Sequence, residues 1–240
     1  MPALPVVAAA VLAVAVGGLV QSGAGLGLGL VASPVITLLD PAIMPGALLV
    51  ASAALPALIL AREAAHADWR GVSWAMAGRL VGTVIGVWIV AAVSLRALGL
   101  VVGGIVLAAI AATGLSAAVP RNRWTLITAG VISGSTATAT SIGGPPVALL
   151  YQQEQGPRVR ATLSLYFLLG NFLAVTALAV SGHLPGRDIT TGLVLACAAV
   201  AGFACSGGAR RFLDYGRTRV AVLTISGVSA IVLIGHSLLG

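Results

Sequence analysis

Hydrophobic residues fill most of the chain and are interrupted at intervals by short polar or glycine-rich stretches. The apolar segments lie at residues 4–20, 26–39, 42–61, 71–92, 98–118, 124–134, 141–150, 160–181, 189–208 and 218–238. A helix needs about 20 residues to cross the hydrocarbon core of a bilayer. Six segments reach that length, whereas 26–39, 124–134 and 141–150 are short. The pattern predicts an all-α membrane protein, a polytopic helical bundle.

The short segments border two stretches whose composition opposes a regular helix. QSGAGLGLGLVASP at residues 21–34 has glycine at four alternate positions, and GVISGSTATATSIGGPP at residues 130–146 ends in two glycines and two prolines. Both residue types weaken or break helices. Hydrocarbon offers no hydrogen-bond partner to irregular backbone, so such stretches occur only where protein or a water-filled cavity surrounds them. We therefore predict broken or re-entrant helices inside the bundle at both places.

The second half of the chain repeats features of the first half at a distance of 112 residues. The matched pairs are Gly18 with Gly130, Pro34 with Pro146, Val35 with Val147, Leu38 with Leu150, Pro45 with Pro157 and Ser52 with Ser164. Each half holds five segments, an odd number, so the second half must lie inverted in the membrane. This predicts one membrane domain of two inverted repeats, residues 1–118 and 119–240, an architecture that recurs in secondary transporters.

Composition and charge agree with membrane insertion. Hydrophobic residues make up 59% of the chain and charged residues 8%, and the mean hydropathy is +1.08, which excludes a soluble globular domain. The formal net charge of +7 comes from arginine, because the chain has no lysine. Most arginines flank the apolar segments, which favours a topology signal over nucleic-acid binding.

The arginines also predict an orientation, because cytoplasmic loops are enriched in basic residues. With both termini outside, ten arginines face the cytoplasm and only Arg96 and Arg187 face out. The cytoplasmic set is Arg62, Arg70, Arg121, Arg123, Arg158, Arg160, Arg210, Arg211, Arg217 and Arg219.

The two glycine-rich stretches supply the candidate substrate-binding residues. Helices that start after a break would point their N-termini inward and favour an anion. Thr136, Thr138 and Thr140 alternate, so an extended backbone would place their hydroxyls on one face. The candidates are Gln21, Ser22, Gly23, Gly25, Pro34, Ser135, Thr136, Thr138, Thr140, Ser141, Gly143, Gly144, Pro145 and Asn171. Two alternatives stay open: glycines that only allow close helix packing, and hydroxyls that bond to their own helix.

Arg79 is the one charged residue well inside a predicted span, about 15 Å from the interfacial Trp69. An arginine at such depth costs about 2.5–3.5 kcal/mol on insertion, which favours a partner, a cavity or a bound ligand around it. We include Arg79 among the substrate-binding candidates. Snorkelling to the surface or capping of a broken helix are alternative roles.

Features expected of an enzyme are missing from the sequence. The six acidic residues fall in or beside predicted loops, and no metal-binding or nucleotide-binding pattern stands in the required context. We therefore predict a protein that is not an enzyme and that has no cofactor and no metal site.

Several segments together resemble a known family. They are the glycine-rich stretch ending at Pro34, ADWRG at residues 67–71 followed by Gly82 and Gly86, and then Gly134, Gly143, Gly144, Pro145 and RATLSLYFLLGN at residues 160–171. In this order they resemble the TauE/SafE sulfite exporter family. In this chain leucines separate the first glycines and the second stretch is rich in threonine. Asp68 and Trp69 are also explained by a helix N-terminus and an interface anchor.

The resemblance implies a multi-pass permease of a prokaryotic plasma membrane. It implies transport of sulfite, a sulfonate or a related organic acid, with Gly23, Gly25, Pro34, Gly143, Gly144 and Pro145 as the residues carried over. We expect a secondary transporter, with an anion channel and a non-transporting scaffold subunit as alternatives. The expected partners are a small anion and the lipid bilayer; no nucleic acid is expected, and a homo-oligomer stays open.

Overall fold

The computed structural model describes residues 4–24, 28–114, 119–154, 156–209 and 215–239. These residues form helices joined by short loops and contain no strand, so the predicted all-α class is confirmed. The helices are α1 (Leu4–Ala24), α2 (Leu28–Leu39), η1 (Pro41–Ile43), α3 (Gly46–Ser52), α4 (Ala54–Glu63), η2 (Ala64–His66), α5 (Trp69–Ala92), α6 (Leu95–Gly114), α7 (Arg123–Thr140), α8 (Gly144–Leu150), α9 (Pro157–Val180), α10 (Gly186–Ala209) and α11 (Tyr215–Leu239).

Among the described residues, four helical stretches are long and apolar enough to cross a membrane. They are Gly46–His66, Trp69–Ala92, Pro157–Val180 and Gly186–Cys205. Each overlaps one of the six segments predicted to span. Many of their large side chains, Trp88 and Phe172 among them, are exposed on the outer surface, as expected of helices that face lipid.

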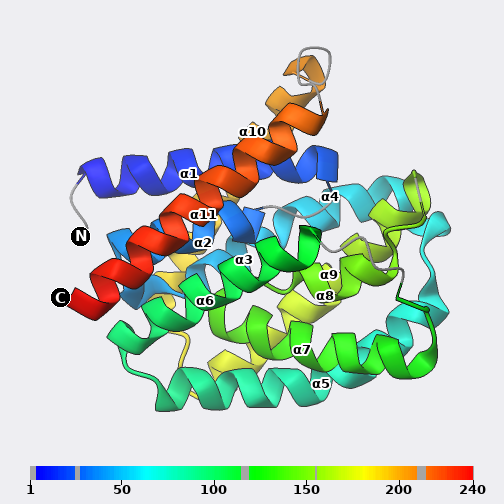
Figure 1. Cartoon of the computed structure of the whole chain (residues 1–240), viewed down its shortest axis with the longest axis horizontal. Helices are drawn as coiled ribbons and strands as arrows, with labels where there is room; N and C mark the ends of the chain where they lie inside the picture. Colours follow the sequence, from blue (N-terminus) through cyan, green and yellow to red (C-terminus); the bar gives the residue numbers. More distant parts are fainter. Residues whose placement is uncertain (1–3, 25–27, 115–118, 155, 210–214, 240) are drawn as a thin grey trace.

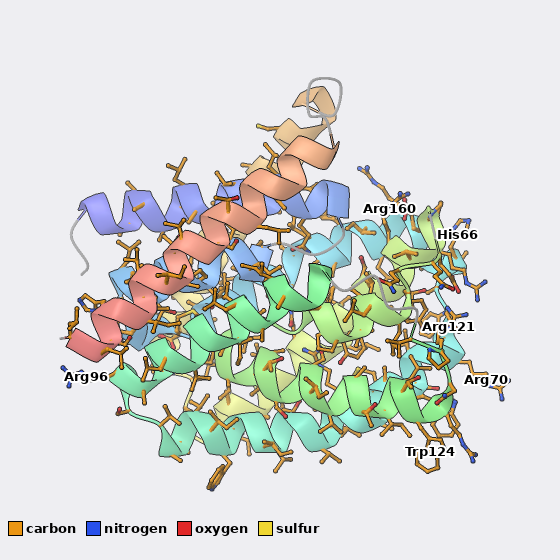
Figure 2. All side chains as sticks on the ribbon, viewed as in Figure 1. His66, Arg70, Arg96, Arg121, Trp124 and Arg160 are labelled. Carbon is orange, nitrogen blue, oxygen red and sulfur yellow. The ribbon has the colours of Figure 1, made fainter. Side chains whose placement is uncertain are left out.

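Several charged side chains lie at opposite ends of the molecule. Arg70, Arg121 and Arg160 lie at one end of the molecule, and Arg96 lies at the other (Figure 2). We call the first the arginine-rich end. This separation is the one that the predicted orientation requires, with the arginine-rich end in the cytoplasm.

Two interfaces dominate the packing: α5 against α7 (Figure 1), and α1 against α10. In the first, a Cβ atom at Gly78 would overlap the carbonyl oxygen of Ile127, and one at Gly130 would overlap that of Ala75. Such glycines let two helix backbones touch, as small residues do in membrane helices.

The α1–α10 interface repeats these contacts. A Cβ atom at Gly202 would overlap the carbonyl oxygen of Ala15, and one at Gly18 would overlap that of Ala199. Ala15 and Gly18 precede Ile127 and Gly130 by 112 residues, the distance of the sequence repeat. Gly202 and Ala199 follow Gly78 and Ala75 by 124 residues. The same contacts therefore recur with the helices of the two halves exchanged.

The second glycine-rich stretch is interrupted later than predicted. Helix α7 continues through Thr140, and the chain turns at Ser141, whose φ of 62° is in the left-handed region. Helix α8 then begins at Gly144, with prolines in its first turn. The extended backbone predicted for Thr136, Thr138 and Thr140 is therefore wrong. Two of these hydroxyls bond to carbonyls one turn earlier: Thr136 donates to Ile132 (3.0 Å), and Thr140 to Thr136 (2.8 Å).

The first glycine-rich stretch is also more helical than predicted. Helix α1 extends through Ala24 and α2 starts at Leu28, so an irregular backbone over all of residues 21–34 is wrong. Gly25 lies outside the described residues. Pro34 lies inside α2, and because proline lacks an N–H, the carbonyl of Leu30 loses its helical donor.

The two stretches contact each other in the interior. The buried Ser33 hydroxyl of α2 donates to the carbonyl of Thr140 at the end of α7 (2.7 Å), and the Ser141 hydroxyl donates to the carbonyl of Pro45 (3.0 Å). At Gly29 a Cβ atom would overlap the carbonyl oxygen of Ser141. The start of α2 and the α7–α8 break thus touch backbone to backbone.

Candidate anion site

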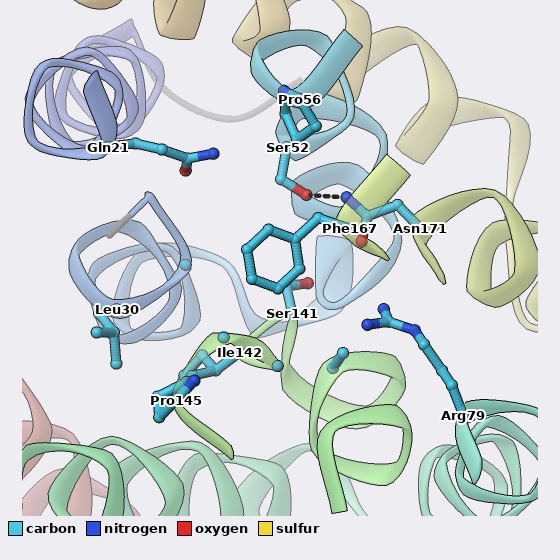
Figure 3. A pocket seen from close by; sticks show the side chains of 14 residues that line it. Gln21, Leu30, Ser52, Pro56, Arg79, Ser141, Ile142, Pro145, Phe167 and Asn171 are labelled. Atoms are coloured by element: carbon cyan, nitrogen blue, oxygen red, sulfur yellow. Dashed lines mark hydrogen bonds between the residues drawn. The ribbon is translucent and has the colours of Figure 1, made fainter. Parts of the chain in front are cut away.

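A cavity of about 50 Å³ lies where α1, α2, α9 and the α7–α8 break meet (Figure 3). One water molecule needs about 10–15 Å³ of such volume, so the cavity has room for a few waters or a small ion. Its lining residues are Gln21, Gly29, Leu30, Ser52, Pro56, Arg79, Ala137, Ser141, Ile142, Gly143, Gly144, Pro145, Phe167 and Asn171.

Arg79 is the only charged residue in this lining. It projects from the middle of α5 and has an exposed fraction of 0%. Its Nε and Nη2 atoms have no hydrogen-bond partner, and Nη1 reaches the Ser133 hydroxyl only at 3.5 Å. Because the guanidinium is fully covered, neighbouring side chains must shift slightly before a ligand in the cavity touches it. A buried cation without an anionic partner is costly, which makes this group a candidate ligand-binding residue.

Helix α9 holds the guanidinium in place. The Cζ atom of Arg79 lies 4.7 Å from the centre of the Tyr166 ring, a cation–π contact. One turn further along α9, a Cβ atom at Gly170 would overlap Arg79 Nε. The Tyr166 ring and the absence of a side chain at Gly170 together leave a slot that fits a flat guanidinium.

Most other polar groups around the cavity already have partners. Asn171 Nδ2 donates to the Ser52 hydroxyl (3.0 Å), which joins α9 to α3 (Figure 3). The side-chain oxygen of Gln21 accepts the amide of Leu28 (3.3 Å), and the Ser133 hydroxyl donates to the carbonyl of Gly143. The unpaired donors of Arg79 therefore distinguish it from its neighbours.

The sulfite exporter TauE/SafE family model matches residues 10–233, nearly the whole chain. The chain belongs to this family. The resemblance seen in the sequence is thus confirmed, and with it a membrane transporter family. No curated protein and no solved structure matches the chain.

The structure brings seven of the predicted site residues of this TauE/SafE protein together. Gln21, Arg79, Ser141, Gly143, Gly144, Pro145 and Asn171 line the cavity. The backbone of Ser22 and Gly23 continues α1, and their side chains are outside the described set, as is Gly25. Whether any of these residues binds substrate stays a prediction.

Five other predicted residues lie away from the cavity. Ser135 and Thr136 bond to carbonyls of their own helix, as does Thr140. Thr138 packs against α5: a Cβ atom added at Gly86 of α5 would lie 2.6 Å from the Cβ atom of Thr138. Pro34 is buried inside α2. The hydroxyls of Ser135, Thr136 and Thr140 thus follow the alternative interpretation, in which they bond to their own helix.

The structure shows one of the two predicted helix N-termini partly occupied and the other on a short helix. The amide of Leu28 at the start of α2 is taken by Gln21, and α8 has only seven residues. Among the described lining residues, Arg79 is the side chain that carries a positive charge.

Sequence reasoning missed the residues that position Arg79. Tyr166, Gly170 and Ser133 come from two helices that meet α5 only in the folded protein. A signal was present, because Tyr166 and Gly170 belong to the family-like segment RATLSLYFLLGN, which also contains Asn171.

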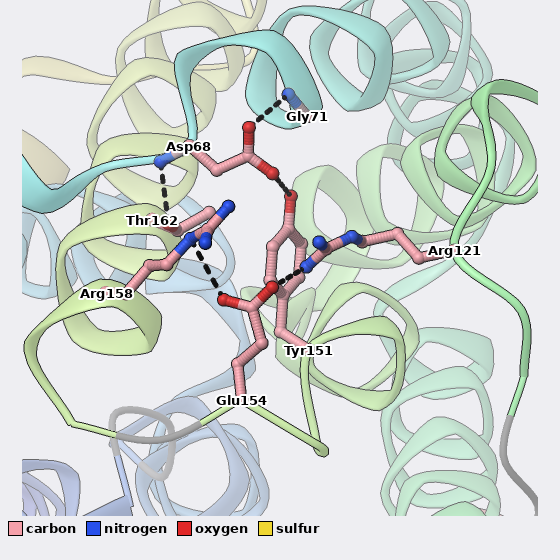
Figure 4. Close-up of polar contacts among 7 residues, drawn as sticks. All are labelled: Asp68, Gly71, Arg121, Tyr151, Glu154, Arg158 and Thr162. Carbon is pink, nitrogen blue, oxygen red and sulfur yellow. Dashed lines mark hydrogen bonds and ion pairs between the residues drawn. The ribbon is translucent and has the colours of Figure 1, made fainter.

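A second polar cluster lies at the arginine-rich end (Figure 4). As the sequence predicted, Asp68 stands at a helix N-terminus: its carboxylate accepts the amide of Gly71 (3.0 Å). The Tyr151 hydroxyl donates to the same carboxylate (3.1 Å), and the amide of Asp68 donates to the Thr162 hydroxyl (2.9 Å). Burial and the nearby Asp68 carboxylate raise the pKa of Tyr151, so this hydroxyl stays protonated at physiological pH.

Ion pairs extend this cluster. Glu154 pairs with Arg121 and with Arg158 (3.1 Å), and Arg160 pairs with Glu63 (2.7 Å). The contacts of Asp68 and Glu63 join residues of the predicted first repeat to residues of the second. They fasten the two parts of the chain together at the arginine-rich end.

Proposed function

We propose that this TauE/SafE protein is a secondary transporter that moves a small anion across a prokaryotic plasma membrane, and that Arg79 binds the anion. Sulfite, a sulfonate and a related organic acid are the substrates that its family and its cavity support. The observation that carries the proposal is the Arg79 guanidinium, fully buried with two nitrogens unpaired beside a small cavity. An anion that enters supplies the missing partner.

The lining fits a small anion that also has an apolar part. The apolar part of the cavity wall consists of Leu30, Pro56, Ile142 and Phe167. Polar groups come from Gln21, Ser52 and Asn171 (Figure 3). Sulfonates and small carboxylates combine an oxygen-rich head with such a part. The recurring glycine contacts of α5–α7 and α1–α10 support the inverted repeat on which alternating access would act.

The direct test measures uptake of radiolabelled sulfite and methanesulfonate into liposomes that contain the purified protein. We expect saturable uptake that is accelerated by counter-substrate inside. Arg79→Gln should lower the uptake rate roughly 100-fold, because removing one member of a buried charge pair costs about 3 kcal/mol. Arg96→Gln, at the opposite end and exposed, is the matched control and should keep the wild-type rate.

A second variant separates the position of the guanidinium from its charge. Gly170→Ala keeps Arg79 but places a methyl group on its Nε atom, so uptake should fall roughly tenfold. Gly186→Ala serves as the control, because nothing lies within 4 Å of the added atom. Uptake that does not saturate would instead indicate a channel. An assembled protein without uptake of either anion would indicate a scaffold.

A further inference from the structure

The described residues that line the cavity carry one positive charge and no negative charge. Of its lining residues only Arg79 is ionisable, and the other polar groups are amides, hydroxyls and backbone. Arginine is a permanently charged residue type in proteins. The electrostatics of the site therefore depend on the charge of the ligand alone.

Among the described lining residues that come from the second half of the chain, none is charged. By the contacts of the two glycine interfaces, the position in α10 that corresponds to Arg79 is Phe203, 124 residues later. Phe203 is partly buried and packs against the apolar core of α1 and α2. Arg79 is thus the single cationic group among the described residues of the cavity lining.

A ligand with one negative charge neutralises Arg79, whereas a ligand with two leaves a net negative charge in the protein interior. An unpaired charge inside a membrane protein is disfavoured by an amount that corresponds to roughly a 100-fold population difference. Hydroxyls and amides solvate an ion, but they do not cancel its charge.

We propose, on the basis of the proposed function, that this transporter selects singly charged anions over doubly charged ones. A substrate that titrates between these two states is then carried in its protonated, singly charged form. The proton binds to a substrate oxygen from water on the entry side and is released to water on the exit side. One proton thus accompanies each such substrate, with no carboxylate needed in the cavity lining.

The test compares methanesulfonate, which has one charge, with sulfate, which has two and a similar head group. In proteoliposomes we expect methanesulfonate uptake at least about 100 times faster than sulfate uptake at equal concentration. Sulfite uptake should rise from mildly basic to mildly acidic pH in proportion to its singly charged fraction, while methanesulfonate uptake stays constant. Sulfate uptake within a few-fold of that of methanesulfonate would overturn the inference but leave the proposed function standing.

A gain-of-function variant adds a second arm. Gln21→Lys places another cation on the cavity wall, so the ratio of sulfate to methanesulfonate uptake should rise about tenfold or more. An unchanged ratio in a protein that still transports methanesulfonate would also count against charge selection. If wild-type protein moves none of the three anions, the proposed function itself fails.

Discussion

The α5–α7 and α1–α10 interfaces are built alike but differ in what they bury. Both bring glycines against carbonyls of the facing helix, at matching positions of the two halves. Between α5, α7 and α9 the side chain that follows Gly78 is Arg79, whereas the residue that follows Gly202 is Phe203. The backbone contact is common to both interfaces, and the charge belongs to only one. Close helix packing and a buried charge are thus separate features of these two interfaces.

The largest expected effect comes from disrupting the close glycine–carbonyl contacts that both interfaces share. Gly78→Leu and Gly202→Leu each force a side chain against a backbone carbonyl, which cannot move aside without separating the helices. Each should lower stability by more than about 3 kcal/mol, above the usual cost of overpacking. Thermal unfolding and yield in detergent provide the measurement. Gly104→Leu, whose added Cβ would meet nothing within 4 Å, should change neither; tolerance of leucine at only one interface would refute their equivalence.

A smaller effect tests the buried charge of Arg79, which has no counterpart at Phe203 in α10. Arg79→Met removes a buried, unpaired cation, so the anion-free protein should become more stable by about 1–3 kcal/mol. Methanesulfonate should raise the melting temperature of the wild type and leave that of the variant unchanged, because a ligand stabilises only the state that binds it. Phe203→Leu is the matched change in α10 and should keep the full response to the anion. An equal rise in Arg79→Met would show that the ligand binds elsewhere.

The smallest effect compares the starts of α5 and α10. Asp68 caps α5 and accepts a hydrogen bond from Tyr151, so Asp68→Ala should cost about 1–2 kcal/mol. Asp188, in the first turn of α10, is buried, and its ion pair is the longer 3.5 Å contact with the exposed Arg187. Because removing Asp188 also removes the cost of burying its carboxylate, Asp188→Ala should cost less than about 1 kcal/mol. Chemical unfolding of the two variants in parallel decides the order.

Hydropathy was sufficient to predict the helical class and the separation of charges between the two ends. These features depend on solvent preference summed over many residues, which a single sequence records. The exact place of each interruption was not predictable, because threonines between residues 136 and 140 bond to their own helix and pack against α5. Tertiary packing overrides local preference there.

The candidate site was predictable at the one residue whose insertion into the membrane is itself unfavourable. Arg79 stood out because a charge at membrane depth requires compensation. The residues around Arg79 did not stand out by their chemistry, since Tyr166 and Gly170 contact it only after α9 packs beside α5. A residue that acts by shape, such as Gly170, has no chemical signature of its own, and only the family-like segment that contains it pointed to it.

The contacts of Ser33 and Ser141 limit how this molecule can move. Each serine binds a carbonyl that belongs to the other predicted repeat, and Gly29 leaves no gap between the two backbones. The start of α2 and the break after α7 are consequently held together by direct contacts. Under the proposed alternating access, these central contacts would stay intact if the chain bends elsewhere.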